Sequence, residues 1–185
     1  MLLSILIPTL PDRINQYTEL INCINIQLTQ LNAFDKVEII TDDRGRSIPT
    51  GTKRNDLINK AKGLYTVFID DDDKLPLFYI YEVLKAIESN PDVITFKGYM
   101  TTNNIDRVDF IIKLNESYEE RKGIYYRYPN HLCPIKRELI KDVKFEDITI
   151  GEDYKWATKI KELDLLKTEV HIDCNMYHYD YKTNK

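Results

Sequence analysis

The chain has 185 residues, 43% of them hydrophobic, which suffices for one domain with a substantial core. Its 26 basic and 30 acidic residues give a net charge of -4, and the absence of any polybasic stripe disfavours nucleic acid as an electrostatic partner. The three cysteines are widely spaced, which argues against a disulfide framework and favours reduced thiols.

The apolar amino terminus predicts a buried strand rather than a leader or a membrane anchor. It is interrupted by Pro8 and followed by Asp12 and Arg13, with no basic region before it and no small-residue cleavage site after it. No other stretch approaches the roughly 18 to 20 apolar residues that a membrane-spanning helix needs. We therefore expect a soluble, cytoplasmic protein with no membrane span.

Strands and helices alternate over the first 70 residues. Apolar and β-branched runs predict the strands, and apolar residues at three- and four-residue intervals predict the helices. The expected elements are a strand at 2–7, a helix at 14–31, a strand at 37–41, a short helix at 50–63 and a strand at 64–69. This order indicates an α/β fold with a mostly parallel central sheet flanked by helices.

The rest of the chain has a less regular pattern. The expected elements are a helix at 76–89, a strand at 93–96, an irregular stretch to 134, a helix after Gly151, and closing strands at 167–172 and 176–181. One side of the helix after Gly151 is expected to carry Tyr154, Ala157, Ile160 and Leu163. No linker or repeat divides the chain, so we expect a single domain over 1–185.

Four consecutive aspartates, Asp70 to Asp73, follow directly on the strand at 64–69. Ligands of parallel α/β sheets bind beyond the carboxyl ends of the strands, where this run must emerge. Carboxylate oxygens are hard ligands that suit Mg²⁺ or Mn²⁺, and four clustered negative charges call for a counter-ion. The alternative is a solvated acidic turn.

Five short motifs occur in one order along the chain. They are Ser4-Ile5-Leu6-Ile7-Pro8-Thr9, Asp42-Asp43, Lys53-Arg54-Asn55 with Ala61-Lys62-Gly63, Phe68-Ile69-Asp70-Asp71-Asp72-Asp73, and Gly151-Glu152-Asp153. Together they resemble the family 2 glycosyltransferases of the GT-A (nucleotide-diphospho-sugar transferase) fold. The likeness covers about the first 75 residues and resumes at Gly151. It implies a donor half at 1–97 and an acceptor-facing half at 98–185.

The resemblance implies inverting transfer of a sugar from a nucleoside diphosphate sugar, usually UDP-linked, to an acceptor hydroxyl. The residues at donor-binding positions are Pro8, Thr9, Asp42, Asp43, Arg54, Asp70 and Asp71. Each also has an ordinary structural interpretation. Thr9 could be a helix cap, Asp42 and Asp43 a turn pair, and Arg54 a surface helix residue.

The resemblance also implies a Mn²⁺ or Mg²⁺ site. In the family's Asp-x-Asp signature the outer residues are Asp70 and Asp72, with Asp72 as the metal ligand and Asp70 nearer the ribose. A shift of the signature to Asp71 and Asp73 stays open. Some enzymes of this fold take a late histidine as a further ligand, which points to His178, although a histidine packed among tyrosines is the simpler interpretation.

Inverting transfer needs a base that accepts the proton of the acceptor hydroxyl. Asp153 stands at the family's base position, and Glu152 is the neighbour that could orient it or the acceptor. The alternative is a helix amino terminus at which two acids are favoured by the helix dipole. Candidate cations for the leaving diphosphate are Lys136, Arg137 and Lys182.

Other interpretations stay open from the sequence. A nucleotidyltransferase or other phosphoryl-transfer enzyme would use similar acids, but no glycine-rich phosphate loop is present. A non-catalytic nucleotide-sugar binding module is a second rival. A zinc site would draw on His131, Cys133, His171, Cys174 and His178. Two groups of tyrosines, 125, 126, 128 and 177, 179, 181, suit either stacking on a ligand or sheet packing. A homo-oligomer or a partner subunit could complete the site of so short a chain.

Overall fold

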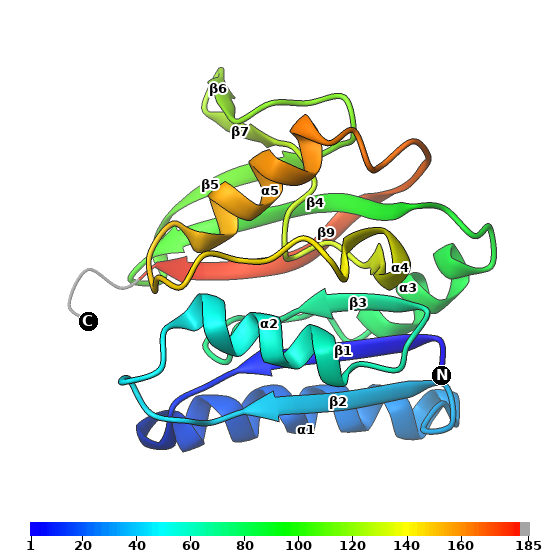
Figure 1. Ribbon diagram of the computed structural model, residues 1–185, viewed down its shortest axis with the longest axis vertical. Helices are drawn as coiled ribbons and strands as arrows, with labels where there is room; N and C mark the ends of the chain where they lie inside the picture. Colours follow the sequence, from blue (N-terminus) through cyan, green and yellow to red (C-terminus); the bar gives the residue numbers. More distant parts are fainter. Residues whose placement is uncertain (182–185) are drawn as a thin grey trace.

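The computed structural model describes residues 1–181, which form one mixed sheet of nine strands (Figure 1). The strands are β1 (Leu3–Pro8), β2 (Val37–Asp42), β3 (Tyr65–Phe68), β4 (Val93–Thr102), β5 (Ile105–Ile112), β6 (Glu119–Arg121), β7 (Ile124–Arg127), β8 (Ile135–Lys136) and β9 (Glu169–Tyr181). Their order across the sheet is β2-β1-β3-β8-β4-β5-β7-β6, and β9 pairs with β4.

Helices cover both faces of this sheet. They are the 3-10 turn η1 (Pro11–Arg13) and the α-helices α1 (Ile14–Leu31), α2 (Thr50–Lys60), α3 (Tyr79–Ile87), α4 (Arg137–Ile140) and α5 (Glu152–Glu162). α2 and α5 contact one another on one face, and α1 and α3 contact one another on the other (Figure 1).

The predicted alternation of strands and helices is confirmed in the first 70 residues. β1 pairs in parallel with both β2 and β3, and all six of its residues are buried, as its unbroken apolar sequence predicts. The α/β class is therefore confirmed. The carboxyl ends of β1, β2 and β3 point to the same edge of the sheet, where α5 also begins (Figure 1).

The expectation of a mostly parallel sheet is wrong beyond β3, where antiparallel pairing enters. β8 pairs antiparallel with β3 and β4, and β4 pairs antiparallel with β5. The β4–β5 connection turns at Asn103 and Asn104, whose φ angles are 52° and 61°. Asparagine tolerates this left-handed region, which makes a tight hairpin accessible without glycine.

The two closing strands expected near the carboxyl terminus are a single 13-residue strand, β9, which pairs in parallel with β4. The register with β4 shifts on either side of Lys97, opposite the residues that the sequence pattern left between the two expected strands. Tyr177 is buried within β9, so its ring packs in the sheet. Among residues 1–181, no helix combines the length and apolar character that a membrane crossing requires.

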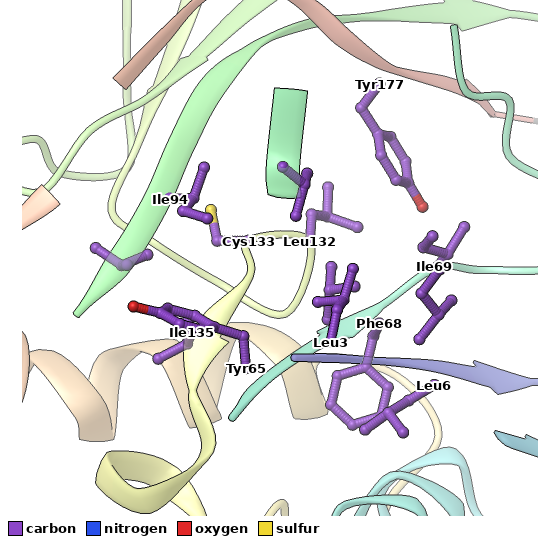
Figure 2. Packing of buried hydrophobic residues seen from close by; sticks show 14 of the residues in the cluster. Leu3, Leu6, Tyr65, Phe68, Ile69, Ile94, Leu132, Cys133, Ile135 and Tyr177 are labelled. Carbon is purple, nitrogen blue, oxygen red and sulfur yellow. The ribbon is translucent and has the colours of Figure 1, made fainter. Parts of the chain in front are cut away.

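The core joins the two halves of the chain (Figure 2). Leu6 of β1 lies beside Phe68 of β3 on one face of the sheet, and Leu3 points to the other face, where the loop residues Leu132 and Cys133 also lie. The ring of Tyr177 enters this core with its hydroxyl directed toward the end of β3 (Figure 2). Cys23, Cys133 and Cys174 are free thiols, as their spacing predicted.

Candidate active site

Asp71 is the most firmly held member of the acidic run. Its side chain is 1% exposed and accepts hydrogen bonds from Thr9 Oγ1 at 2.6 Å and Arg13 Nη1 at 2.8 Å. Lys53 Nζ, also buried, donates to the carbonyl oxygen of Thr9 at 2.9 Å. These contacts tie the ends of β1 and β3 to η1 and α2, so the edge at which the aspartates emerge is cross-linked by charge-assisted hydrogen bonds.

The next two aspartates are also contacted by protein side chains. Arg13 Nη1 lies 3.3 Å from Asp72 Oδ2, and the Tyr177 hydroxyl donates to Asp73 Oδ2 at 2.6 Å. Burial, together with the nearby carboxylates, raises the pKa of Tyr177 well above its ordinary value, which keeps this donor protonated. Part of the counter-charge that the sequence argument assigned to a cation is thus supplied by Arg13, a residue that the sequence analysis did not place in the site.

Asp70 faces the opposite side of the run and meets Arg54. Arg54 Nη2 donates to Asp70 Oδ1 at 2.9 Å, and its guanidinium lies over the Phe68 ring at 4.9 Å. The Arg54 side chain is only 3% exposed, so the interpretation as a surface helix residue is wrong. Burial alone would raise the pKa of Asp70, but Arg54 and His131 outweigh it, and the pKa lies well below its usual range.

The Glu152-Asp153 pair reaches the same place from α5. Arg54 Nε lies 3.3 Å from Glu152 Oε1, so one buried guanidinium spans both acidic segments. Burial raises the pKa of Glu152, against the lowering effect of Arg54. Asp153 is 40% exposed and therefore open to a ligand, whereas Glu152 is 6% exposed.

His131 makes a second link between the two acidic segments. Its Nε2 lies 3.7 Å from Asp70 Oδ2 and its Nδ1 lies 3.5 Å from Asp153 Oδ2, and the side chain is 7% exposed. The His131 carbonyl accepts a hydrogen bond from Phe68 N at 3.0 Å, which docks its loop on β3. The only sequence signal for His131 was as a zinc candidate, because the loop that carries it has no regular pattern.

The motif Lys53-Arg54-Asn55 also fixes where α5 begins. The Asn55 amide exchanges hydrogen bonds with the backbone of Phe145, both at 2.9 Å. Gly51 N donates to Ile148 O at 3.0 Å, and a Cβ at Gly51 would lie 1.8 Å from the carbonyl oxygen of Glu146. Only glycine permits this approach, which brings the segment leading into α5 against the start of α2.

The residues predicted at the ends of β1 and β2 lie side by side. Pro8 is in register with Asp42, and Thr9 N donates to Asp42 O at 2.9 Å. Asp42 is buried, forms an ion pair with Arg44 at 2.5 Å, and has a lowered pKa because that pairing outweighs its burial. Asp43 is exposed. A cavity of about 290 Å³ opens here, lined by Thr9, Leu10, Pro11, Ile14, Tyr17, Thr41 and Asp43.

His178 lies beside the acidic run through its backbone, which pairs with that of Lys74. Its Nε2 is 2.8 Å from Thr101 Oγ1, and its ring stacks on Tyr99 at 4.3 Å. In this structure the His178 side chain is packed against an aromatic ring, as the simpler interpretation expected. Within residues 1–181, no three His, Cys, Asp or Glu side chains are arranged as a metal-binding group, and this covers the five zinc candidates.

Two of the cations suggested for a leaving diphosphate, Lys136 and Arg137, are not brought to the site. Lys136 pairs with Tyr65 at the start of β3 and forms an ion pair with Asp92. Arg137 N donates to Leu64 O, also at the amino end of β3. Lys182 lies outside the described residues. Within residues 1–181, Arg13 and Arg54 form ion pairs with the aspartates, His131 lies near Asp70, and Lys53 is one hydrogen bond away.

Comparison with known proteins identifies a shared fold. No family model and no curated sequence matches the chain. A crystal structure of S. aureus TarS residues 1–349 in complex with UDP-GlcNAc superposes with a TM-score of 0.70 at 16% identity, over 100% of this chain and 60% of that one. The same protein in complex with UDP gives 0.69 at 16% identity, over 97% and 60%. A197 from STIV gives 0.52 at 14% identity, over 94% and 82%. The chain thus spans about three fifths of the TarS 1–349 fragment and 37% of a longer TarS chain, and it shares their fold.

Proposed function

We propose that the chain is a metal-dependent inverting glycosyltransferase of the family 2 type, which moves a sugar from a UDP-sugar to an acceptor hydroxyl. One observation carries the proposal: Arg54 and His131 each contact Asp70 and one member of the Glu152-Asp153 pair. The acidic run and the acidic pair therefore belong to one site. A strand-end site of this kind is where the fold class binds its ligands.

The donor is assigned to the edge formed by β1, β2 and β3, within residues 1–97. TarS, which shares the fold, holds UDP-GlcNAc and UDP in its structures. The cavity beside Thr9, Tyr17 and Asp43 has about 290 Å³ and both aromatic and polar walls, which suits a nucleobase. Thr9 lines this cavity and donates a hydrogen bond to Asp71. Pro8 and Asp42 stand in register at the ends of β1 and β2.

The metal is assigned to Asp72, with Asp70 nearby and His178 as the third candidate. Carboxylates are suitable ligands for Mn²⁺ or Mg²⁺, and the Asp72 side chain is 18% exposed, so it can be reached from solvent. When bound, the cation would offset the charge of the diphosphate. Arg13, 3.3 Å from Asp72, adds a positive side chain at the same point. His178 would have to leave Thr101 in order to take part.

Asp153 is assigned as the base. The acceptor oxygen attacks the anomeric carbon, the bond from that carbon to the diphosphate oxygen breaks, and the hydroxyl proton passes to the Asp153 carboxylate. His131 Nδ1, 3.5 Å from Asp153 Oδ2, is placed to orient this carboxylate, and such contacts commonly tighten when substrate binds. Glu152 is buried against Arg54 and so positions the start of α5.

The direct test is calorimetric titration of UDP, GDP and UDP-GlcNAc into the full chain, with Mn²⁺ and with a chelator. We expect cation-dependent binding of a uridine nucleotide that Asp72→Ala weakens at least tenfold. Release of UDP rather than pyrophosphate separates transfer from nucleotidyl chemistry, and turnover itself excludes a pure binding module. No binding of any nucleotide would refute the proposal.

A further inference from the structure

A groove runs beside α5, starting next to Asp153. It has about 400 Å³ and is lined by Ser117, Tyr118, Tyr128, Tyr154, Ala157, Thr158, Lys161 and Glu162. In Figure 1, α5 is seen in front of β5 and below the β6–β7 hairpin. The lining residues come from α5 and from the segments on either side of that hairpin. The groove therefore belongs to the part of the chain after β4, away from the strand ends assigned to the nucleotide.

Two tyrosines present their rings at the opening of this groove. Tyr154 is 53% exposed and Tyr118 is 39% exposed, and their rings meet edge to face with centroids 5.0 Å apart. The sequence pattern placed Tyr154 on one side of α5 with Ala157 and Ile160, and these two are buried, as is Trp156, whereas Tyr154 stays exposed. Tyr154 is thus a large aromatic side chain that the core does not use, and such surfaces commonly mark binding sites.

The back of the groove is rigid and polar. Tyr128 is 4% exposed, and Lys161 Nζ lies over its ring at 5.2 Å. Lys161 Nζ is itself held by the carbonyl of Glu116 at 3.0 Å and by Ser117 Oγ at 2.8 Å. The groove therefore combines exposed aromatic faces with fixed hydrogen-bonding groups.

A closed chain of contacts connects the groove to the candidate base. His131 lies 3.5 Å from Asp153, and its neighbour Asn130 donates through Nδ2 to the Tyr118 hydroxyl at 3.3 Å. Tyr118 packs on Tyr154, which follows Asp153 in α5. Burial, with a contribution from the charge of Asp153, raises the pKa of Tyr118 to about 12, so its hydroxyl stays protonated.

We propose that this groove binds a saccharide acceptor and that Tyr118 and Tyr154 form its stacking platform. The proposal rests on the function proposed above, because it assigns the hydroxyl at Asp153 to a sugar. Sugar rings have apolar C–H faces that pack on aromatic rings and hydroxyls that need hydrogen-bond partners. The groove offers both. Residues 154 to 161 of α5 extend along it for about 10 Å at 1.5 Å per residue.

The test uses saturation-transfer NMR on the full chain with three probes, methyl β-D-glucopyranoside, methyl N-acetyl-β-D-glucosaminide and methyl α-D-mannopyranoside. A Gly-Ser-Gly peptide is the fourth. We expect at least one glycoside to bind, and its Kd to rise about tenfold in Tyr154→Ala and in Tyr118→Ala. Tyr154→Phe keeps the ring and should bind nearly as the wild type does. The matched control is Tyr81→Ala on α3, a tyrosine that is 49% exposed.

The UDP titration runs in parallel and separates the two proposals. Unchanged UDP affinity in all four variants, with glycoside binding lost only in the groove variants to alanine, supports the saccharide site. Three outcomes would overturn the saccharide site alone. The wild-type protein could bind UDP but no glycoside, it could bind only the peptide, or the alanine variants could bind glycosides as well as the wild type does. Wild-type protein that binds no nucleotide overturns the proposed function.

Discussion

The two ends of the candidate site differ in how their carboxylates are held. At the strand edge, Asp71 is 1% exposed and accepts one hydrogen bond from the Thr9 hydroxyl and one from the Arg13 guanidinium. At the start of α5, Asp153 is 40% exposed, and its Oδ2 lies 3.5 Å from Nδ1 of His131. One end is locked by short contacts within the fold, and the other is open to solvent.

This difference matches two separate roles, binding of the donor and removal of a proton from the acceptor, in the proposed function. In the proposed function the donor is held through its diphosphate by groups fixed in advance. The contacts of Asp71 with Thr9 and Arg13 fix such groups at the strand edge. A base must reach a substrate that enters from solvent, so it cannot be buried in the same way. Arg54 and His131 connect the two ends and keep their geometry constant. A substitution at one end, or at Arg54 or His131 between them, therefore tests whether the other end changes.

Asp153, at the open end, should affect the rate of UDP release but not UDP affinity or stability. Asp153→Asn is expected to lower the rate of UDP release from UDP-GlcNAc by about 10²- to 10⁴-fold, because it removes the proposed general base. UDP affinity and the free energy of unfolding should stay near the wild-type values, since Asp153 is 40% exposed. Steady-state kinetics with calorimetry measures both, and Asp142→Asn, an exposed site, is the control. Equal loss of UDP affinity would show that the two ends are not separate.

The link should control stability. Arg54→Met is expected to lower the free energy of unfolding by about 3 to 5 kcal/mol, because it leaves the partly buried Asp70 and the buried Glu152 without their shared cation. Arg107→Met is the matched control, since Arg107 also pairs with a carboxylate, Asp109, and lies over a ring, Tyr99, but is 51% exposed. Its loss should cost only about 0 to 1 kcal/mol. Urea unfolding compares them, and similar losses would contradict the assigned role of burial.

His131 should affect the open end more than the locked end. We expect His131→Ala to lower kcat for UDP release about tenfold, with the KM for UDP-GlcNAc within twofold of wild type, because Asp153 loses its orienting partner. His131→Asn keeps a polar group at the position and should recover part of the loss. A change confined to KM would assign His131 to donor binding instead.

The pH dependence of stability should show the smallest effect. The folded pKa of Asp70 is lowered, so its pairing stabilises the fold above the unfolded pKa of about 4 and is lost as the pH falls toward the folded value. Asp70→Asn should therefore be about 1 to 3 kcal/mol less stable than wild type near pH 6, with the difference shrinking below pH 4. A difference independent of pH from 6 to 2 would indicate that Asp70 acts through packing rather than charge.

Much of the strand-edge end could be predicted from the sequence. Unbroken apolar runs predicted β1 and β3, and the position of Asp70 directly after β3 placed the acidic run at the carboxyl edge. The pairing of β1 with β2 brings Thr9 beside Asp42 at the same edge. These inferences succeeded because strand period, chain order and the edge rule for parallel sheets are all local or topological properties.

The rest depended on contacts between distant segments. Arg13 appeared to be an ordinary residue after a proline, and His131 lies 61 positions beyond Asp70 in an irregular loop. The mixed sheet arose from a hairpin at two asparagines and from the two-residue strand β8, which is too short to show a period. Tyr154 stays exposed although Ala157, on the same side of α5, is buried, and the sequence pattern did not single out Trp156 as a core residue.

The sequence by itself determined the α/β order of the first 70 residues, the edge at which the aspartates emerge and the chemistry of an acidic site. Only the tertiary structure decided which charges meet. Arg54 lies between Asp70 and Glu152 because α2 packs against both β1 and α5, and His131 faces Asp153 because its loop hydrogen-bonds to β3. Ion pairing depends on distance in space, and the spacing of residues along a chain does not encode that distance beyond a few turns of regular structure.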